Sequence, residues 1–245
     1  VDLKALQRTD KHVLWQIDFA EIFTGKNPGF DIAIANPPYL RKEEVDTLFS
    51  STGLNLTKNM LQHGYKLTTG LKVSGHADLY IYFYLRAMTL LRQNDGVLVF
   101  ITSNAWIDVG YGSLLQEYFL CSSRSFTIFE DRYHRSFIGA DINTIIVNLQ
   151  LGESDIHNAN ARFVVIRSGI ASMSGICEFK SSVNKEDFSS DTNLRVFPTT
   201  YGDLFKEGQS PDGKYTGSKW GGKYLRAPDS FHHLILKSSH VKLSN

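Results

Sequence analysis

The sequence has few cysteines, no long apolar run and almost no net charge. Cys121 and Cys177 are too few and too isolated for a disulfide framework or a zinc site, and we expect both to be reduced thiols. No apolar run approaches the ~18 residues of a membrane helix, and residues 1–4 are polar, unlike the start of a signal peptide. A net charge of +1 argues neither for nor against nucleic acid. We therefore expect a cytoplasmic globular protein with no metal site and no membrane contact.

An initiator methionine is also absent, which predicts that the chain begins inside a longer protein. What the chain does contain is an alternation of strand and helix patterns. Apolar runs predict strands at 31–35, 97–101, 125–129 and 142–149, whereas longer apolar segments predict helices at 78–92 and 112–120. A short helix at 42–49 and a long polar loop at 51–75 lie between the first strand and the first long helix.

This order of elements predicts an α/β fold with a mostly parallel sheet and helices on its faces. The last two strands have no helix between them, so we expect one of them to be antiparallel, near the C-terminal end of the sheet. Segments 168–182 and 207–222 are rich in serine and glycine. We therefore place a boundary near residue 180, with one unit at 1–180 and an irregular extension at 181–245.

One tetrapeptide, Asn36-Pro37-Pro38-Tyr39, follows the first predicted strand directly. The carboxyl ends of strands form the ligand crevice in this class of sheet, and two prolines fix the backbone there. The side-chain oxygen of Asn36 and the carbonyl of Pro37 would accept the two protons of an exocyclic amino group, while the ring of Tyr39 would stack on a base. A base inside a duplex reaches such a pocket only when it is flipped out. The tetrapeptide alone also fits a simple turn.

The resemblance to a known family extends beyond this tetrapeptide. Ordered matches include Gly29 to Tyr39, the Ala-Asp-Leu-Tyr at 77–80, the strand and Asn104 that follow Gly96, Gly110-Tyr111-Gly112, and the Lys-Tyr-Leu-Arg-Ala-Pro at 223–228. Together they resemble the adenine-specific DNA methyltransferases of type IIG restriction–modification systems. The segment from Trp15 to Phe23 resembles the stretch that precedes the catalytic motif in those enzymes.

The resemblance implies a class I, Rossmann-like methyltransferase sheet, of which this chain would be the catalytic half. It implies S-adenosylmethionine as the methyl donor and the N6 amino group of adenine in double-stranded DNA as the acceptor. Phe137 resembles the aromatic residue on the other face of the flipped base, with core packing as the alternative. Asp18 is a weak candidate for a donor contact, and Asp78 is expected to cap its helix. The tail from 223 resembles the lead into a target-recognition domain.

One part of the family pattern is missing. No Gly-x-Gly turn follows a strand before residue 31, and Gly110-Tyr111-Gly112 lies nine residues beyond its strand, where we expect it to shape the start of a helix. The isolated chain is therefore expected to bind the donor poorly, to be inactive alone, and to self-associate through the open edge of the strand at 31–35. Two alternatives remain: methylation of RNA or of a protein glutamine, and a truncated, non-catalytic module that binds DNA or a partner.

Overall fold

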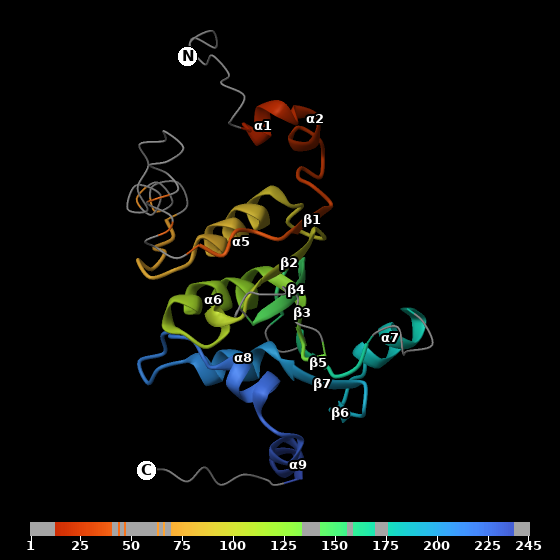
Figure 1. The fold of residues 1–245 in the computed structure, drawn as a ribbon. Coiled ribbons are helices and arrows are strands. Elements are labelled where there is room, and N and C mark those ends of the chain that lie inside the picture. The colour runs from red at the N-terminus through yellow and green to blue at the C-terminus, as the bar shows by residue number, and fades with distance from the viewer. Residues whose placement is uncertain are drawn as a thin grey trace.

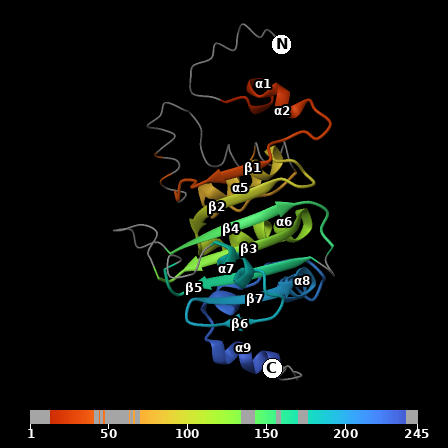
Figure 2. The same ribbon diagram turned by 90° about the vertical axis from the view of Figure 1, so that its right-hand side faces the viewer.

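The computed structural model describes residues 13–40, 70–133, 143–155, 159–169 and 176–237, together with the single positions 44, 47, 63 and 66. Its centre is a seven-stranded sheet in the order β1-β2-β4-β3-β5-β7-β6 (Figures 1 and 2). The strands are β1 (Ile32–Ala35), β2 (Val97–Ser103), β3 (Ser123–Asp131), β4 (Thr144–Leu151), β5 (Asn160–Ile166), β6 (Ser189–Ser190) and β7 (Leu194–Thr200). The four strands predicted from the sequence are β1 to β4.

The helices fall on both sides of this sheet. They are α1 (Trp15–Asp18), α2 (Ala20–Phe23), α5 (Leu79–Leu90), α6 (Ser113–Ser122), α7 (Ile176–Val183), α8 (Tyr201–Gly208) and α9 (Asp229–Lys237), with short turns η1 (Ala105–Ile107), η2 (Gly110–Gly112) and the π-helix η4 (Gly221–Arg226). The two long predicted helices are therefore confirmed as α5 and α6. Most of the segments 42–49 and 51–75 lies outside the described residues.

The direction of the strands confirms the predicted mixed α/β fold. β1 pairs in parallel with β2 and β3 with β5, whereas β4 runs antiparallel between β2 and β3. The antiparallel strand expected among the last two is thus β4. A second antiparallel strand, β7, lies between β5 and β6. Because the remaining strands share one direction, the carboxyl ends of β1, β2, β3 and β5 meet at the same edge of the sheet.

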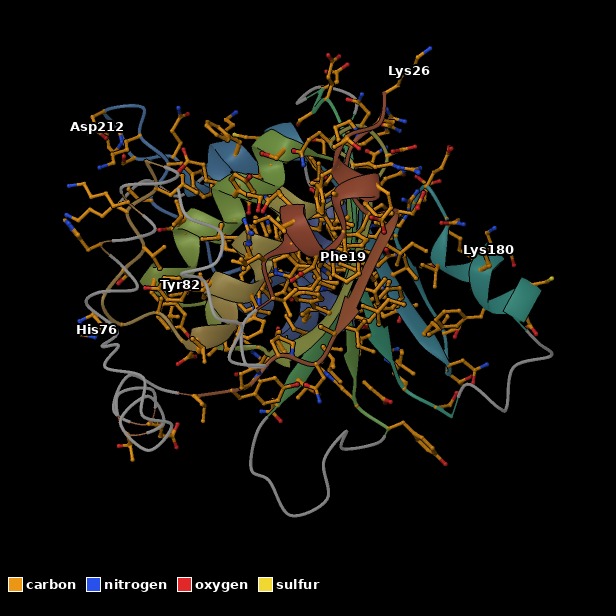
Figure 3. All side chains as sticks on the ribbon, turned by 90° about the horizontal axis from the view of Figure 1, so that it is seen from above. Phe19, Lys26, His76, Tyr82, Lys180 and Asp212 are labelled. Carbon is orange, nitrogen blue, oxygen red and sulfur yellow. The ribbon has the colours of Figure 1, made fainter. Side chains whose placement is uncertain are left out.

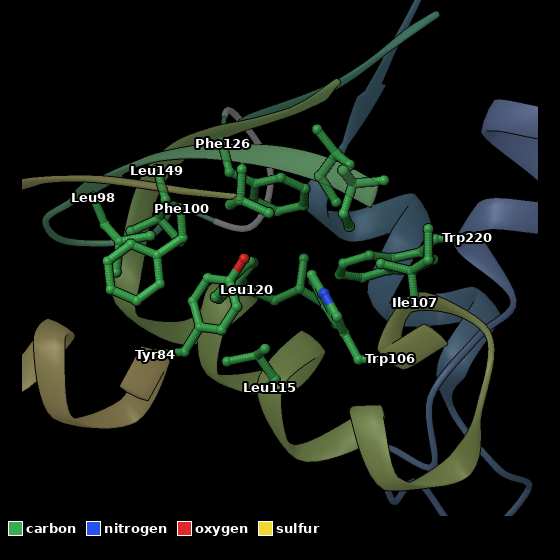
Figure 4. Packing of buried hydrophobic residues seen from close by; sticks show 14 of the residues in the cluster. Tyr84, Leu98, Phe100, Trp106, Ile107, Leu115, Leu120, Phe126, Leu149 and Trp220 are labelled. Carbon is green, nitrogen blue, oxygen red and sulfur yellow. The ribbon is translucent and has the colours of Figure 1, made fainter. Parts of the chain in front are cut away.

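The expected irregular character of residues 181–245 is wrong for the described part of that segment. β7 pairs along its whole length with β5, and its Pro198 lies beyond the short β6, at an open edge where a residue without an N–H is tolerated. The indole ring of Trp220 stacks on Phe126 at 5.5 Å and contacts Trp106 at 6.3 Å. Residues on both sides of position 180 therefore share one core (Figure 4).

That core is aromatic and lies between the sheet and helices α5, α6 and α8 (Figures 1 and 4). Tyr84 of α5 contacts Phe100 of β2 at 5.0 Å, and Phe119 of α6 contacts Phe126 of β3 at 5.6 Å. Full burial of one such side chain stabilises the fold by about 1.5–3 kcal/mol. The apolar character of residues 79–90 on nearly all sides is explained by this position, since most of α5 is buried.

The two faces of the sheet are covered unequally. α7 covers the face opposite α5, α6 and α8 around β3, β5 and β7, as Figure 2 shows. In Figure 3, Lys180 of α7 lies on the opposite side from His76. At β1 that face is open: Ile32 is 57% exposed and Ile34 75% exposed. Buried parallel strands usually have both faces covered, so the β1 end of the sheet is only half enclosed.

The helix start that the sequence predicted at Gly110-Tyr111-Gly112 is confirmed, because η2 leads directly into α6. A methyl group on Gly112 would overlap the carbonyl oxygen of Trp106, whereas one on Gly110 would meet nothing within 4 Å. Glycine at position 112 is therefore required by the close approach of two backbone segments.

Replacing Trp220 should test whether 181–245 belongs to the common core. We expect Trp220→Ala to lower the free energy of unfolding by about 3–5 kcal/mol, as for other large-to-small changes in a core, while the chain still unfolds in one transition. Urea unfolding followed by circular dichroism measures both. Trp15→Ala, at a half-buried position, serves as the control with a smaller loss. Two separate transitions in the unmutated chain would contradict a shared core.

The two glycines of η2 offer a matched pair. Gly112→Ala should destabilise the protein by at least the ~1–3 kcal/mol typical of overpacking, because the obstructing atoms are backbone. Gly110→Ala should be neutral or stabilising by about 0.4–1 kcal/mol, since alanine restricts the unfolded chain. Thermal unfolding of both variants measures the difference, and equal melting temperatures would refute the close approach at Gly112.

Candidate functional site

The tetrapeptide Asn36-Pro37-Pro38-Tyr39 lies at the carboxyl end of β1. The register of the parallel pair sets Ala35 beside Phe100, so the chain leaves β1 next to the last residues of β2. The side chain of Asn36 is exposed, and that of Pro37 is buried. The amide of Asn36 is thus presented to solvent at the edge where ligands bind in sheets of this class.

Tyr39 is held from two sides. Its hydroxyl donates a hydrogen bond to the carbonyl of Ile101 in β2 at 3.1 Å, and its ring meets the ring of Tyr80 edge-on, with centroids 6.3 Å apart. Burial raises the pKa of the Tyr39 hydroxyl, so this group stays protonated and keeps its donor role. The ring of Tyr39, which we expect to stack on a base, is therefore held both by its hydroxyl and by its contact with Tyr80.

A second layer of hydroxyl groups lies behind Tyr39. The hydroxyls of Tyr80 and Tyr111 are 3.1 Å apart, and the Tyr111 hydroxyl donates to Asp78 Oδ2 at 2.8 Å. One turn further along α5, the hydroxyl of Tyr84 lies 3.2 Å from Thr102 Oγ1. The contact between Tyr111 and Asp78 could not be predicted from local sequence patterns, because 33 residues separate them.

The expectation that Asp78 caps α5 is wrong. Asp78 occupies the N-cap position, but its carboxylate makes no capping hydrogen bond to the helix. It accepts from Tyr111 instead. The first amide of α5, that of Leu79, donates to the carbonyl of Leu40 at 3.1 Å, and so the helix start is tied to the tetrapeptide segment.

Two further residues, Phe137 and Asp18, were also predicted to belong to the site. Phe137 lies outside the described residues. Asp18 Oδ2 accepts from the amide of Leu14 at 2.8 Å and so closes its own helical turn. α1 and α2 contact the strand through Phe30, which precedes β1 and meets Trp15, Phe19 and Phe23 edge-on; Figure 3 labels Phe19. A donor contact from Asp18 stays a prediction.

A groove of about 440 Å³ runs along the unpaired side of β1. It is lined almost entirely by apolar side chains, among them Trp15, Ile34, Phe83 and Leu90, with Arg86 as its charged member. Among the described strands, β1 lies at the end of the sheet and pairs with β2 alone. The groove therefore combines apolar walls with backbone groups of β1 that no described strand pairs, a combination that favours pairing with another strand.

Arginines at the ends of three strands anchor the tail, a feature that the sequence analysis missed. Arg195 Nη1 donates to the carbonyl of Ala227 at 2.6 Å and lies 3.0 Å from Asp229 Oδ1, while Arg132 Nη2 donates to the carbonyl of Leu225 at 2.5 Å. Arg167 Nη2 is 2.6 Å from Asp229 Oδ1. The segment 225–229 is thus attached to the same carboxyl edge as Asn36. Arg132 and Arg167 directly follow β3 and β5, and Arg195 is the second residue of the antiparallel β7.

Within the described part of the chain, no three His, Cys, Asp or Glu side chains come close enough together to hold a metal ion. Among those same residues, no helix has the length and apolar character needed to cross a membrane.

Comparison with known proteins agrees with this geometry. The chain is 32% identical over 119 residues to the type II methyltransferase M.XamI of Xanthomonas campestris pv. amaranthicola, a match that covers 49% of this chain and 21% of that protein. The chain thus spans about a fifth of that curated relative.

Two solved structures share the fold. One is a modification subunit of a putative type I restriction enzyme from Vibrio vulnificus YJ016, with a TM-score of 0.58 and 13% identity over 85% of this chain and 41% of that one. The other is the type IIG restriction endonuclease BpuSI, with a TM-score of 0.52 and 15% identity over 72% of this chain and 20% of that one.

A family model described as Eco57I restriction-modification methylase matches residues 2–134, which is more than half of the chain and includes Asn36 to Tyr39, α5, β2 and η2. This chain belongs to the Eco57I restriction-modification methylase family.

Proposed function

We propose that this chain is the catalytic half of a DNA methyltransferase that transfers a methyl group from S-adenosylmethionine to the N6 amino group of a flipped-out adenine, within a restriction–modification system. The observation that carries the proposal is the position of Asn36 to Tyr39. An exposed carboxamide and a fixed aromatic ring lie together at the carboxyl end of β1, and family membership agrees with this reading.

The chain's own residues would hold and orient the acceptor. Asn36 Oδ1 and the carbonyl of Pro37 would accept the two amino hydrogens, which draws the nitrogen lone pair out of conjugation with the ring. The base would stack on the half-buried ring of Tyr39, which offsets part of the cost of unstacking it from the duplex. Positioning of this kind accounts for most of the rate gain when no covalent intermediate is needed.

S-adenosylmethionine, when bound, would supply an electrophilic methyl group on a sulfonium. Asn36 Oδ1 and the carbonyl of Pro37 would hold the acceptor amino group with its nitrogen lone pair available, and that nitrogen would lose one proton to solvent. The described residues do not fit a complete donor site, since no glycine-rich turn follows a strand before β1 among residues 13–31. We therefore derive no contact to the donor and place its binding mainly outside this chain.

Loss of the Asn36 carboxamide should remove most activity. In the whole protein that contains this chain, we expect Asn36→Ala to lower methyl transfer by about 10²–10³-fold, the range for removing one preorganised polar group. Transfer of tritiated methyl groups to unmethylated bacteriophage DNA, with RNA and protein as parallel acceptors, measures it. DNA affinity should change little, since phosphate contacts dominate binding.

The control is Asn27→Ala, an exposed asparagine in the loop before β1, which should retain full activity. If Asn36→Ala kept more than about a tenth of the activity, the assignment would be wrong. Transfer to RNA or protein in preference to DNA would support the alternative acceptors instead.

The isolated chain should behave as an incomplete enzyme. We expect it to bind S-adenosylmethionine weakly, to transfer no methyl group and to self-associate through the open edge of β1, where Ile34 is exposed. Titration calorimetry and size-exclusion chromatography measure these properties. Ile34→Lys should reduce self-association, because edge lysines block strand pairing, whereas Leu234→Lys, an exposed position on α9, should not. Micromolar donor binding by a monomer would contradict this picture.

A further inference from the structure

Three polar side chains from two distant segments form a closed hydrogen-bonded group, which we name the Asp78 triad: Asp78, Tyr80 and Tyr111. Asp78 and Tyr80 lie at the start of α5, and Tyr111 lies in η2, beyond the end of β2. The Tyr111 hydroxyl is 2.8 Å from Asp78 Oδ2 and 3.1 Å from the hydroxyl of Tyr80. Because Tyr111 can donate only one proton, its donation to the carboxylate leaves its oxygen to accept from Tyr80.

The chain gives up a common stabilising contact to make this group. An aspartate at an N-cap usually accepts a hydrogen bond from its own helix, and loss of that contact costs about 1 kcal/mol. The carboxylate of Asp78 makes no such bond and turns to Tyr111. The Asp78 carboxylate therefore links α5 to η2 and does not stabilise the start of its own helix. This indicates that its role is to join the two segments.

The turn Gly110-Tyr111-Gly112 places Tyr111 beside the start of α5. Gly112 lets the backbone of η2 approach the carbonyl of Trp106 at a distance that no side chain permits. This approach brings the residue before it, Tyr111, over the start of α5. Gly110-Tyr111-Gly112 thus helps to hold Tyr111 beside Asp78.

The Asp78 triad touches the tetrapeptide segment through Tyr80. The side chain of Tyr80 is fully buried, and its ring meets that of Tyr39 at an interplanar angle of 89°. Burial, together with Asp78 and Tyr111, raises the pKa of Tyr80, so its hydroxyl remains a donor. The neighbouring Leu79 amide holds the carbonyl of Leu40. Tyr39 and Leu40 are thereby fixed by consecutive residues of α5.

We propose that Asp78, Tyr80 and Tyr111 are positioning residues, which set the orientation of the Tyr39 ring and hence the placement of the target base against Asn36. This inference rests on the proposed function of Asn36 to Tyr39. The triad touches neither base nor donor; it acts on the ring that the base stacks on. A displacement of about 1 Å in such a site can cost ~10²-fold in rate.

The test removes single oxygen atoms. In the whole protein, Tyr111→Phe and Tyr80→Phe should each lower kcat for DNA methylation by about 10-fold, less than the full cost of a 1 Å displacement. The KM for S-adenosylmethionine and the Kd for DNA should stay within about twofold, because phosphate contacts dominate DNA binding. Asp78→Asn, which keeps an acceptor oxygen, should retain most of the activity that Asp78→Ala loses.

Tyr201→Phe is the matched control. Its hydroxyl is also buried and lies 2.6 Å from Ser123 Oγ, at the amino end of β3 and away from the tetrapeptide. This variant should lose similar stability on urea unfolding but keep its kcat. A merely structural role for the triad predicts the same kcat in Tyr111→Phe and Tyr201→Phe, and that result would overturn the inference.

Asn36→Ala separates the two proposals. Inactivity of Asn36→Ala with unchanged kcat in Tyr111→Phe, Tyr80→Phe and Asp78→Ala would leave the proposed function intact and refute the triad. Full activity of Asn36→Ala would refute the proposed function itself. Equal loss in Asp78→Asn and Asp78→Ala, together with normal Tyr111→Phe, would also count against the triad.

Discussion

The parallel pairing of β1 with β2 is the constraint on which the rest of this site depends. It brings two carboxyl ends to one edge, so that Tyr39, after β1, can donate to the carbonyl of Ile101 in β2. Pro37 and Pro38 end the first strand at that point because proline cannot continue a ladder. The residues that follow are held by the start of α5. The amide of Leu79 donates to the carbonyl of Leu40, and the ring of Tyr80 contacts the ring of Tyr39. A backbone pairing therefore determines where a carboxamide and an aromatic ring are presented.

The same sheet is well enclosed at one end and open at the other. An aromatic core joins β2, β3 and β5 to α5, α6 and η4. β1 carries exposed isoleucines beside an apolar groove, and no described strand pairs with its outer edge. The residues that we propose bind the acceptor base, Asn36 to Tyr39, lie at this boundary, whereas we identify no complete donor site among the described residues. This division agrees with a chain that spans only about a fifth of its curated relative and with our proposal that it is one half of a catalytic unit.

Local patterns in the sequence predicted the elements near the site. The apolar run before Pro37 marked β1, and the apolar segment around Tyr84 marked α5, because hydrophobic periodicity and proline act over a few residues. β5 and β7 were missed, since they lie beside serine- and glycine-rich segments and are recognisable only through their pairing with β3 and with each other. The contact of Asp78 with Tyr111 could not be predicted either. The sequence favours Asp78 as a helix cap. Only the folded chain shows that the Asp78 carboxylate accepts a hydrogen bond from Tyr111 and none from its own helix.

The most direct test of the account is the identity of the methylated nucleoside. The whole protein would be incubated with unmethylated DNA and S-adenosylmethionine, and the DNA then digested to nucleosides and separated by chromatography with mass detection. A pair of acceptors at Asn36 and Pro37 requires an exocyclic amino group, and the account predicts N6-methyldeoxyadenosine as the product. Methylation at carbon 5 of cytosine, a ring carbon that carries no amino hydrogens for these acceptors to hold, would contradict it.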